Sequence, residues 1–394
     1  YHALRMHSNT TLDGNGATIK VTSGGPGAGG HGSIIGNDNA TGLENITVRD
    51  VTIDMASVNQ SSVTIGIIAG NGFVGNYAGT PVENMRIEGC EILDSPYLGI
   101  QLRDGSNNFA IQNNYVKDSG NIGIQIVGRD GRISNNRVVG SGDNAIDIYG
   151  QYRVINYDAR PVAGSFTGSE TLNFSPSGAS ATFYQDTNDA GASGKLLYHS
   201  LTGTPADNDS ITGATSGTQV TASSAEEEPN GNVVISDNFF EDCYRGVFLE
   251  TVGNCAVAGN VVKDSTDYGI MVNRGFGPEP DGHTITGNKI RSAGGGINVN
   301  QVIFRTNVVG NNIELTAGSQ IGIRLQFSYG INVTGNSLRG TGSGDGSTAI
   351  LCTSTGGELL AVGNYWEQIQ NGIDEGPFVV KSVGNYGYNS GANG

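Results

Sequence analysis

Asp143, Asp147 and Tyr149 lie close together in the segment SGDNAIDIYG, residues 141–150. Carboxyl groups can donate and accept the protons that move when a glycosidic bond is hydrolysed, and an aromatic ring can lie against a sugar. Another carboxylic acid, Glu250, lies far along the chain. These residue types indicate chemistry on glycans, provided that the fold brings Glu250 next to the first segment.

A short run built around asparagine recurs along the chain and indicates how such a fold is made. Its period is about 21–28 residues, which is typical of a solenoid. We expect the asparagine to sit in a turn with left-handed geometry and to form a ladder of amide hydrogen bonds. The copies are IQNNYV (111–116), ISNNRV (133–138), ISDNFF (235–240), VAGNVV (257–262), ITGNKI (285–290), VVGNNI (308–313), VTGNSL (333–338), AVGNYW (361–366) and SVGNYG (382–387).

A second repeated strand lies between these runs and alternates apolar and polar residues, as a half-buried strand does. Its apolar positions predict two inward ladders, one through Ile100, Ile124 and Ile146 and one through Leu102, Ile126 and Ile148. The sequence therefore predicts an all-β chain folded as a parallel β-helix, right-handed by analogy with the commonest folds of this kind. A β-propeller would need roughly 40–50 residues for each blade, about twice the observed period.

The outward positions of this second strand carry polar side chains in the middle coils. Amides, arginines, carboxylates and an aromatic residue suit the hydroxyl groups and ring faces of sugars. We predict that substrate binds to Gln101, Arg103, Gln125, Asn273, Arg274, Asn298, Asn300, Arg324 and Gln326.

Asp147 and Glu250 become neighbours when an interruption of the repeat is removed. They would then lie on adjacent coils, two residues apart along the strand, with Cα atoms about 8 Å apart. Their carboxyl groups could be separated by the roughly 6.5–9.5 Å of an inverting glycosidase. We favour Glu250 as the acid, and Asp143 could replace Asp147 as the base. The alternative is that both acids are solvated residues balanced by nearby arginines.

The interruption divides the chain into residues 1–150, an insert at 151–230 and residues 231–394. Within the insert, residues 164–183 and 203–222 resemble two copies of one unit, which predicts a small β-rich subdomain. The paired unit resembles short β repeats of bacteriophage tail proteins, and phage tailspikes are often right-handed β-helices of the pectate-lyase type. The resemblance implies a capsule- or O-antigen-degrading tailspike that forms a homotrimer, placed on a virion tail or outside the cell.

Two other functions stay open at the sequence level. A polysaccharide lyase or uronan epimerase could use Tyr149 with Arg103 or Arg324, and SPYLGIQLRDG (95–105) has the Tyr-x-Gly of a mannuronan-epimerase strand without its Asp-Pro-His-Glu. A non-catalytic adhesin or fibre shaft would use the same polar ladder only to bind glycan.

Composition narrows the choice of partners. The net charge is −16 and no run of lysine and arginine occurs, which argues against nucleic acid and an anionic membrane. The five histidines are scattered, so we expect neither metal nor cofactor. The four cysteines have no metal spacing and are expected to be buried free thiols. Since the chain starts at Tyr1 without a signal pattern, a mature or trimmed form is expected.

Overall fold

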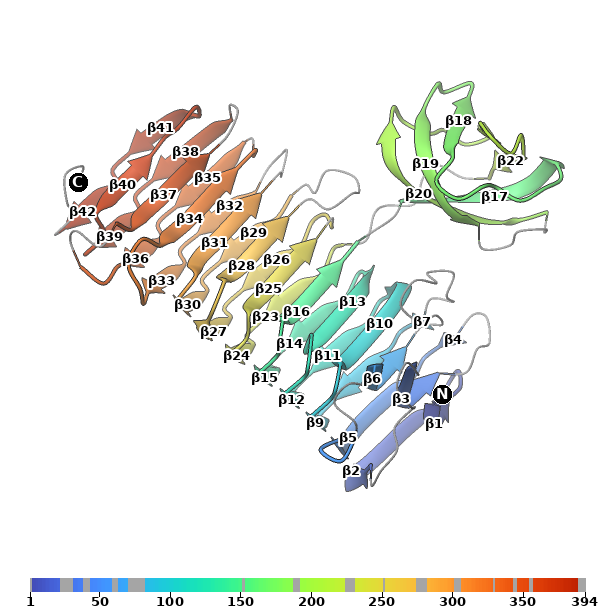
Figure 1. Ribbon diagram of the computed structural model, residues 1–394, viewed down its shortest axis with the longest axis horizontal. Helices are drawn as coiled ribbons and strands as arrows, with labels where there is room; N and C mark the ends of the chain where they lie inside the picture. Colours follow the sequence, from blue (N-terminus) through green and yellow to red (C-terminus); the bar gives the residue numbers. More distant parts are fainter. Residues whose placement is uncertain are drawn as a thin grey trace.

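The computed structural model describes residues 2–21, 31–37, 43–58, 63–69, 82–150, 153–186, 192–223, 231–250, 252–273, 282–300, 306–328, 330–342, 346–353 and 357–388. Within these ranges the chain forms strands and no helix. Parallel strands stack coil upon coil into one long solenoid, and a barrel formed by the inserted residues stands beside it (Figure 1). The expected all-β parallel β-helix is confirmed. No helix in the described residues is long and apolar enough to cross a membrane.

The first sheet holds the strands that carry the candidate site. Successive coils contribute one strand each, and neighbours pair in parallel. Its strands are β1 (His2–Met6), β3 (His31–Asn37), β4 (Leu43–Glu44), β6 (Val63–Ala69), β7 (Val82–Glu83), β10 (Leu98–Asn107), β13 (Ile124–Arg129), β16 (Asn144–Tyr149), β25 (Arg245–Glu250), β28 (Tyr268–Asn273), β31 (Gly295–Asn300), β34 (Ile321–Gln326), β37 (Thr348–Thr353) and β40 (Asn371–Asp374).

The second sheet takes up the remaining strands of the solenoid, usually as two short strands per coil with the repeated asparagine between them. Its strands are β2 (Thr11–Lys20), β5 (Thr47–Asp54), β8 (Arg86–Glu88), β9 (Glu91–Leu93), β11 (Ala110–Gln112), β12 (Tyr115–Lys117), β14 (Arg132–Ser134), β15 (Arg137–Val139), β23 (Val234–Ser236), β24 (Phe239–Glu241), β26 (Ala256–Ala258), β27 (Val261–Ser265), β29 (Thr284–Thr286), β30 (Lys289–Ser292), β32 (Asn307–Val309), β33 (Asn312–Leu315), β35 (Ile331–Thr334), β36 (Ser337–Arg339), β38 (Glu358–Val362), β39 (Tyr365–Glu367), β41 (Val379–Val383) and β42 (Tyr386–Tyr388).

The core of the solenoid consists of the predicted inward ladders. Ile100, Ile124, Ile146 and Val247 are fully buried in one of them, each directly above the last. The glycine that begins many of these strands has a steric cause, since a Cβ on Gly123 would lie 2.5 Å from Cγ1 of Val138. All four cysteines are buried and free, as expected.

The asparagine ladder runs along the solenoid from Asn114 to Asn385. At each step an Nδ2 donates to the Oδ1 of the next asparagine, for example from Asn136 to Asn238 at 3.0 Å, and the backbone N–H donates to the same oxygen. One part of the expectation is wrong: the left-handed residue is the one before the ladder asparagine. Asn135 has a φ of 56° and Gly310 a φ of 62° at this position. The ladder asparagine is therefore needed for the hydrogen bonds of its side-chain amide and not for a left-handed backbone.

The insert forms a closed antiparallel barrel with its own apolar core. The two copies seen in the sequence are two hairpins, and in each of them an acid before the first strand closes a loop. Glu170 accepts backbone hydrogen bonds from Thr167, Thr215 and Ser216, and Asp209 accepts them from Ser177 and Ala206. The barrel strands are β17 (Arg153–Val162), β18 (Thr171–Ser175), β19 (Ser180–Asp186), β20 (Gly194–Thr202), β21 (Ser210–Gly213) and β22 (Gln219–Ala222).

Candidate functional site

Strands β16 and β25 bring the carboxylic acids of the candidate site together. In their parallel register Tyr149 lies opposite Glu250, and Asp147 lies opposite Phe248. Asp147 and Glu250 are thus on adjacent coils and two residues apart along the strand, as the repeat predicts. Standard strand spacings place their Cα atoms about 8 Å apart. Asp143 precedes β16 and also acts electrostatically on both acids.

Amide side chains lead up to Asp147 along the first sheet. The side chain of Gln101 donates from Nε2 to Oε1 of Gln125 at 2.6 Å, and that of Gln125 donates from Nε2 to Oδ2 of Asp147 at 3.3 Å. The second oxygen of Asp147, Oδ1, is buried and accepts no hydrogen bond from any described residue. The three side chains occupy one column because their strands pair in register.

Burial decides the electrostatics of this site. Asp147 and Phe248 occupy outward positions of the strands. Even so, only 5% of Asp147 and 8% of Phe248 is exposed. Loss of hydration raises the pKa of Asp147 to about 7, and repulsion from Glu250 and Asp143 acts in the same direction. The hydrogen bond from Gln125 opposes this rise. A carboxyl group in this state can hold a proton near neutral pH.

The pKa values of the two other acids are also raised. Burial raises the pKa of Glu250, the charge of Arg245 lowers it, and Asp143 raises it. Burial raises the pKa of Asp143, which Arg245 lowers and Asp267 raises. The site thus combines three interacting acids whose pKa values are raised mainly by burial and lowered by the charge of Arg245. Such clusters of perturbed carboxyl groups are characteristic of catalytic sites.

Arg245 is a central residue that the sequence did not reveal. Its Nε donates to Oδ2 of Asp267 at 2.7 Å, and its guanidinium lies 4.9 Å from the ring centroid of Phe248 and 4.7 Å from that of Tyr244. It opens β25, opposite Asn144, one position before the repeated glycine. Extending the repeat frame by one residue before the glycine would have found Arg245, because that position lies next to the acids.

The predicted binding residues form two separate parts of the same sheet. Asn273 and Asn300 continue the column of Glu250 and are linked by a hydrogen bond of 2.8 Å, with Gln326 next in register. Asn298 and Arg324 continue the column of Asp147. Oδ1 of Asn298 and Nε of Arg324 are buried without a hydrogen bond to a described residue. These residues extend the site along the solenoid.

Arg103 and Arg324 lie on strands of the first sheet other than the strand of Tyr149. Strand β10 loses its regular register after Leu102, so the expected alignment of Arg103 is interrupted, and its strand is two coils from β16. Arg324 lies four strand steps beyond Asp147, about 19 Å along the stack. Elimination by Tyr149 with Arg103 or Arg324 stays a prediction. Arg274, the remaining predicted binding residue, lies outside the described residues.

Two family profiles match the chain. The profile of the periplasmic copper-binding protein NosD matches residues 170–371, just over half of the chain and including most of the barrel. The chain belongs to the NosD family. The profile of the right-handed β-helix region matches residues 31–159. No curated protein matches the sequence.

Solved structures share the fold of this NosD-family chain at low identity. The A-module of a mannuronan C-5 epimerase from Azotobacter vinelandii has a TM-score of 0.58 and 11% identity, over 97% of this chain and 84% of that chain. The tailspike of E. coli bacteriophage HK620, in complex with a pentasaccharide, has a TM-score of 0.56 and 11% identity, over 97% of this chain and 59% of the tailspike. These likenesses establish the right-handed β-helix, and the chain spans less than two thirds of the tailspike.

The described residues do not fit the copper in the family name. Copper is held by thiolate, thioether and imidazole groups that converge on one point. Among the described residues no three histidine, cysteine, aspartate or glutamate side chains form such a group. Each cysteine is buried in the core, and burial raises the pKa of Cys255 to about 12, which disfavours the thiolate. No catalytic step is therefore assigned to copper on these residues.

Proposed function

We propose that this protein hydrolyses a polysaccharide with the carboxyl pair Asp147 and Glu250. The observation that carries the proposal is the raised pKa of Asp147, about 7, beside a second acid on the adjacent coil. Two carboxyl groups with different environments are the basis of acid–base catalysis at a glycosidic bond. The similar folds of a mannuronan epimerase and of a pentasaccharide-bound tailspike support a polysaccharide as substrate.

Asp147 is assigned as the general acid. It is the most deeply buried of the three acids, and the hydrogen bond from Gln125 engages Oδ2, which leaves Oδ1 to carry the proton. This reverses the preference for Glu250 that the sequence suggests. A proton held near neutral pH can be delivered to the leaving glycosidic oxygen as the bond breaks.

Glu250 is assigned as the base that activates water. It is less buried than Asp147, and the positive charge of Arg245 stabilises its ionised form. The offset of one coil and two residues is compatible with the roughly 6.5–9.5 Å between carboxyl groups that inverting enzymes use to admit a water. The expected product therefore has the inverted anomeric configuration. Asp143 would hold the water or raise the pKa values of Asp147 and Glu250 through its charge.

The tailspike assignment is a separate proposal about assembly and place. A homotrimer on a phage tail would explain the phage-like units in the insert, whereas the family name points to the periplasm. Light scattering tests the homotrimer. A mass of three chains supports the tailspike, and a mass of one chain contradicts it.

A degradation screen tests the enzymatic proposal. Capsular, O-antigen and uronate polysaccharides are incubated with the protein and with Asp147→Asn and Glu250→Gln, and the products are identified by mass spectrometry. Glu358→Gln, an exposed acid on β38, is the matched control. Saturated products that both site variants fail to make would support hydrolysis. Full activity in either site variant would remove that residue from the mechanism.

A further inference from the structure

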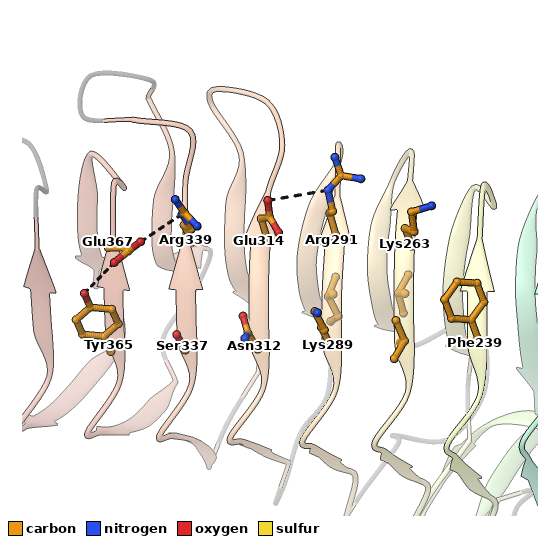
Figure 2. A pocket seen from close by; sticks show the side chains of 13 residues that line it. Phe239, Lys263, Lys289, Arg291, Asn312, Glu314, Ser337, Arg339, Tyr365 and Glu367 are labelled. Atoms are coloured by element: carbon orange, nitrogen blue, oxygen red, sulfur yellow. Dashed lines mark hydrogen bonds and ion pairs between the residues drawn. The ribbon is translucent and has the colours of Figure 1, made fainter.

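A cavity lies on the outer face of the second sheet, away from the candidate acids. It has a volume of ≈ 600 Å³ and crosses strands β24, β27, β30, β33, β36 and β39 (Figure 2). Each coil contributes the later of its two short strands in the second sheet, and the parallel register aligns equivalent residues. Five strand steps of about 4.8 Å give it a length of about 24 Å. This groove is long enough for an extended chain.

Aromatic rings stand at both ends of the groove. Phe239 lies at one end, where the guanidinium of Arg137 is 5.4 Å from its ring centroid. Tyr365 lies at the other end, with its ring centroid 5.9 Å from that of Tyr386 in a stacked arrangement. The same outward column between them carries Val261, Lys289, Asn312 and Ser337. Rings at the ends with small and polar side chains between them suit the apolar faces and hydroxyl groups of sugars.

One edge of the groove is lined by ion pairs. Lys263 pairs with Glu241. Arg291 lies 4.0 Å from Glu314, and Arg339 lies 3.2 Å from Glu367 (Figure 2). These pairs neutralise most of the charge along that edge and hold the long side chains in place. The outward column of the groove is different, because its cation is Lys289 in the middle.

Lys289 makes no ion pair or hydrogen bond with any described side chain, and it is exposed. The other three cations of the groove lining are paired with acids: Lys263 with Glu241, Arg291 with Asp264 and Glu314, and Arg339 with Glu367. The unpaired ammonium group of Lys289 can therefore form a charge-assisted hydrogen bond with an anionic group of a ligand.

We propose that this groove binds an extended anionic glycan, with a sugar carboxylate or sulfate at Lys289 and sugar rings against Phe239 and Tyr365. The inference does not depend on hydrolysis by Asp147 and Glu250, because the groove belongs to the other sheet. In a polysaccharide-degrading enzyme it would keep the substrate chain on the solenoid between cleavage events.

Titration calorimetry with oligosaccharides tests the proposal. The probes are a mannuronate hexasaccharide, a heparin hexasaccharide and neutral maltohexaose, all measured with Asp147→Asn so that cleavage does not interfere. The anionic probes are expected to bind more weakly as salt is added, and maltohexaose is expected not to bind. Because heparin carries both carboxylates and sulfates, binding of heparin without binding of mannuronate would indicate that the site requires a sulfate, whereas binding of mannuronate would show that a carboxylate is enough.

Matched substitutions locate the binding. Lys289→Glu is expected to weaken binding by about tenfold or more, whereas Lys289→Arg stays within about twofold of the parent. Tyr365→Ala is expected to weaken it by about fivefold, whereas Tyr365→Phe, which keeps the ring, retains it. Equal melting temperatures exclude loss of the fold as the cause.

Three outcomes would overturn the inference. Neither anionic probe binds; or both bind with unchanged affinity in Lys289→Glu and Tyr365→Ala; or the protein is an oligomer that Lys289→Glu dissociates, which makes the groove an interface between copies. Loss of polysaccharide cleavage in Asp147→Asn with intact hexasaccharide binding separates this site from the proposed catalytic one.

Discussion

Gln125 donates a hydrogen bond to Oδ2 of Asp147 at 3.3 Å, and the buried Oδ1 of the same carboxyl group receives none from the described residues. The two oxygens of Asp147 therefore have different environments. A proton on Oδ1 leaves the hydrogen bond from Gln125 intact and removes the cost of a buried charge. This relationship underlies the proposal that Asp147 is the proton donor of the acid cluster.

Replacement of either catalytic acid should abolish most of the activity without unfolding the protein. We expect Asp147→Asn to lower kcat by about 10²- to 10⁴-fold, because general acid catalysis contributes that much. Glu250→Gln should have a comparable effect through loss of the base. Reducing-end assays on a cleaved polysaccharide provide the measurement, with Glu358→Gln as the control. A fall in KM alone would contradict both roles.

The stability of the protein should depend on pH through Asp147. The folded protein keeps the proton up to about pH 7, whereas the unfolded chain releases it near the ordinary pKa of 3.8. Between these values the folded state binds more protons, so the free energy of unfolding falls as pH rises. At full ionisation the loss is about 4 kcal/mol.

Asp147→Asn lacks this ionisation and should lose less stability over the same range. Melting temperatures of both proteins at about pH 4.5 and about pH 8 measure the difference. Parallel pH curves for the two proteins would mean that Asp147 ionises normally in the fold.

Removal of the Gln125 amide should shift the pH dependence of catalysis. Gln125 stabilises the ionised form of Asp147, so Gln125→Leu is expected to raise the pKa of that acid further. The alkaline limb of kcat/KM should move upward by about one pH unit. Gln101→Leu, one coil further from Asp147, serves as the control and should leave the limb nearly in place. A downward shift in Gln125→Leu would show that the amide does not donate to the carboxylate.

The left-handed position before each ladder asparagine should tolerate asparagine and reject β-branched residues. Gly310 has a φ of 62° and open space where a Cβ would lie, so backbone strain is the main cost of a side chain. Gly310→Val is expected to destabilise the protein by about 1–2 kcal/mol. Gly310→Asn should cost much less, because Asn113 and Asn135 occupy this position in other coils. Thermal unfolding of the two variants decides between them.

The repeat allowed most of the fold to be predicted because each coil packs on its neighbours in register. Once Ile146 and Val247 were aligned by frame, Glu250 followed directly above Tyr149, and the two acids met across the insert. The same frame predicted the amide ladder. It did not predict which residue is left-handed. A recurring asparagine in the sequence is compatible both with a left-handed turn position and with an amide ladder.

Burial and lateral contacts could not be predicted in this way. Alternation assigns Asp147 to the outer face, yet the structure leaves only 5% of it exposed. Arg245 lies one position outside the repeated motif, and its contact with Asp267 depends on how neighbouring turns approach each other. The groove on the second sheet was not predicted, because Lys289 and Tyr365 belong to the asparagine runs, which were interpreted only as structural.

Hydrolysis by the acid pair is tested most directly by the products formed in water labelled with a heavy isotope of oxygen. The active protein and Asp147→Asn are incubated with the polysaccharide that the screen identifies, and the fragments are weighed by mass spectrometry. The account predicts one labelled oxygen at each new reducing end and no fragments from the variant. Unlabelled, unsaturated fragments that absorb in the ultraviolet would instead show elimination and contradict the assignment.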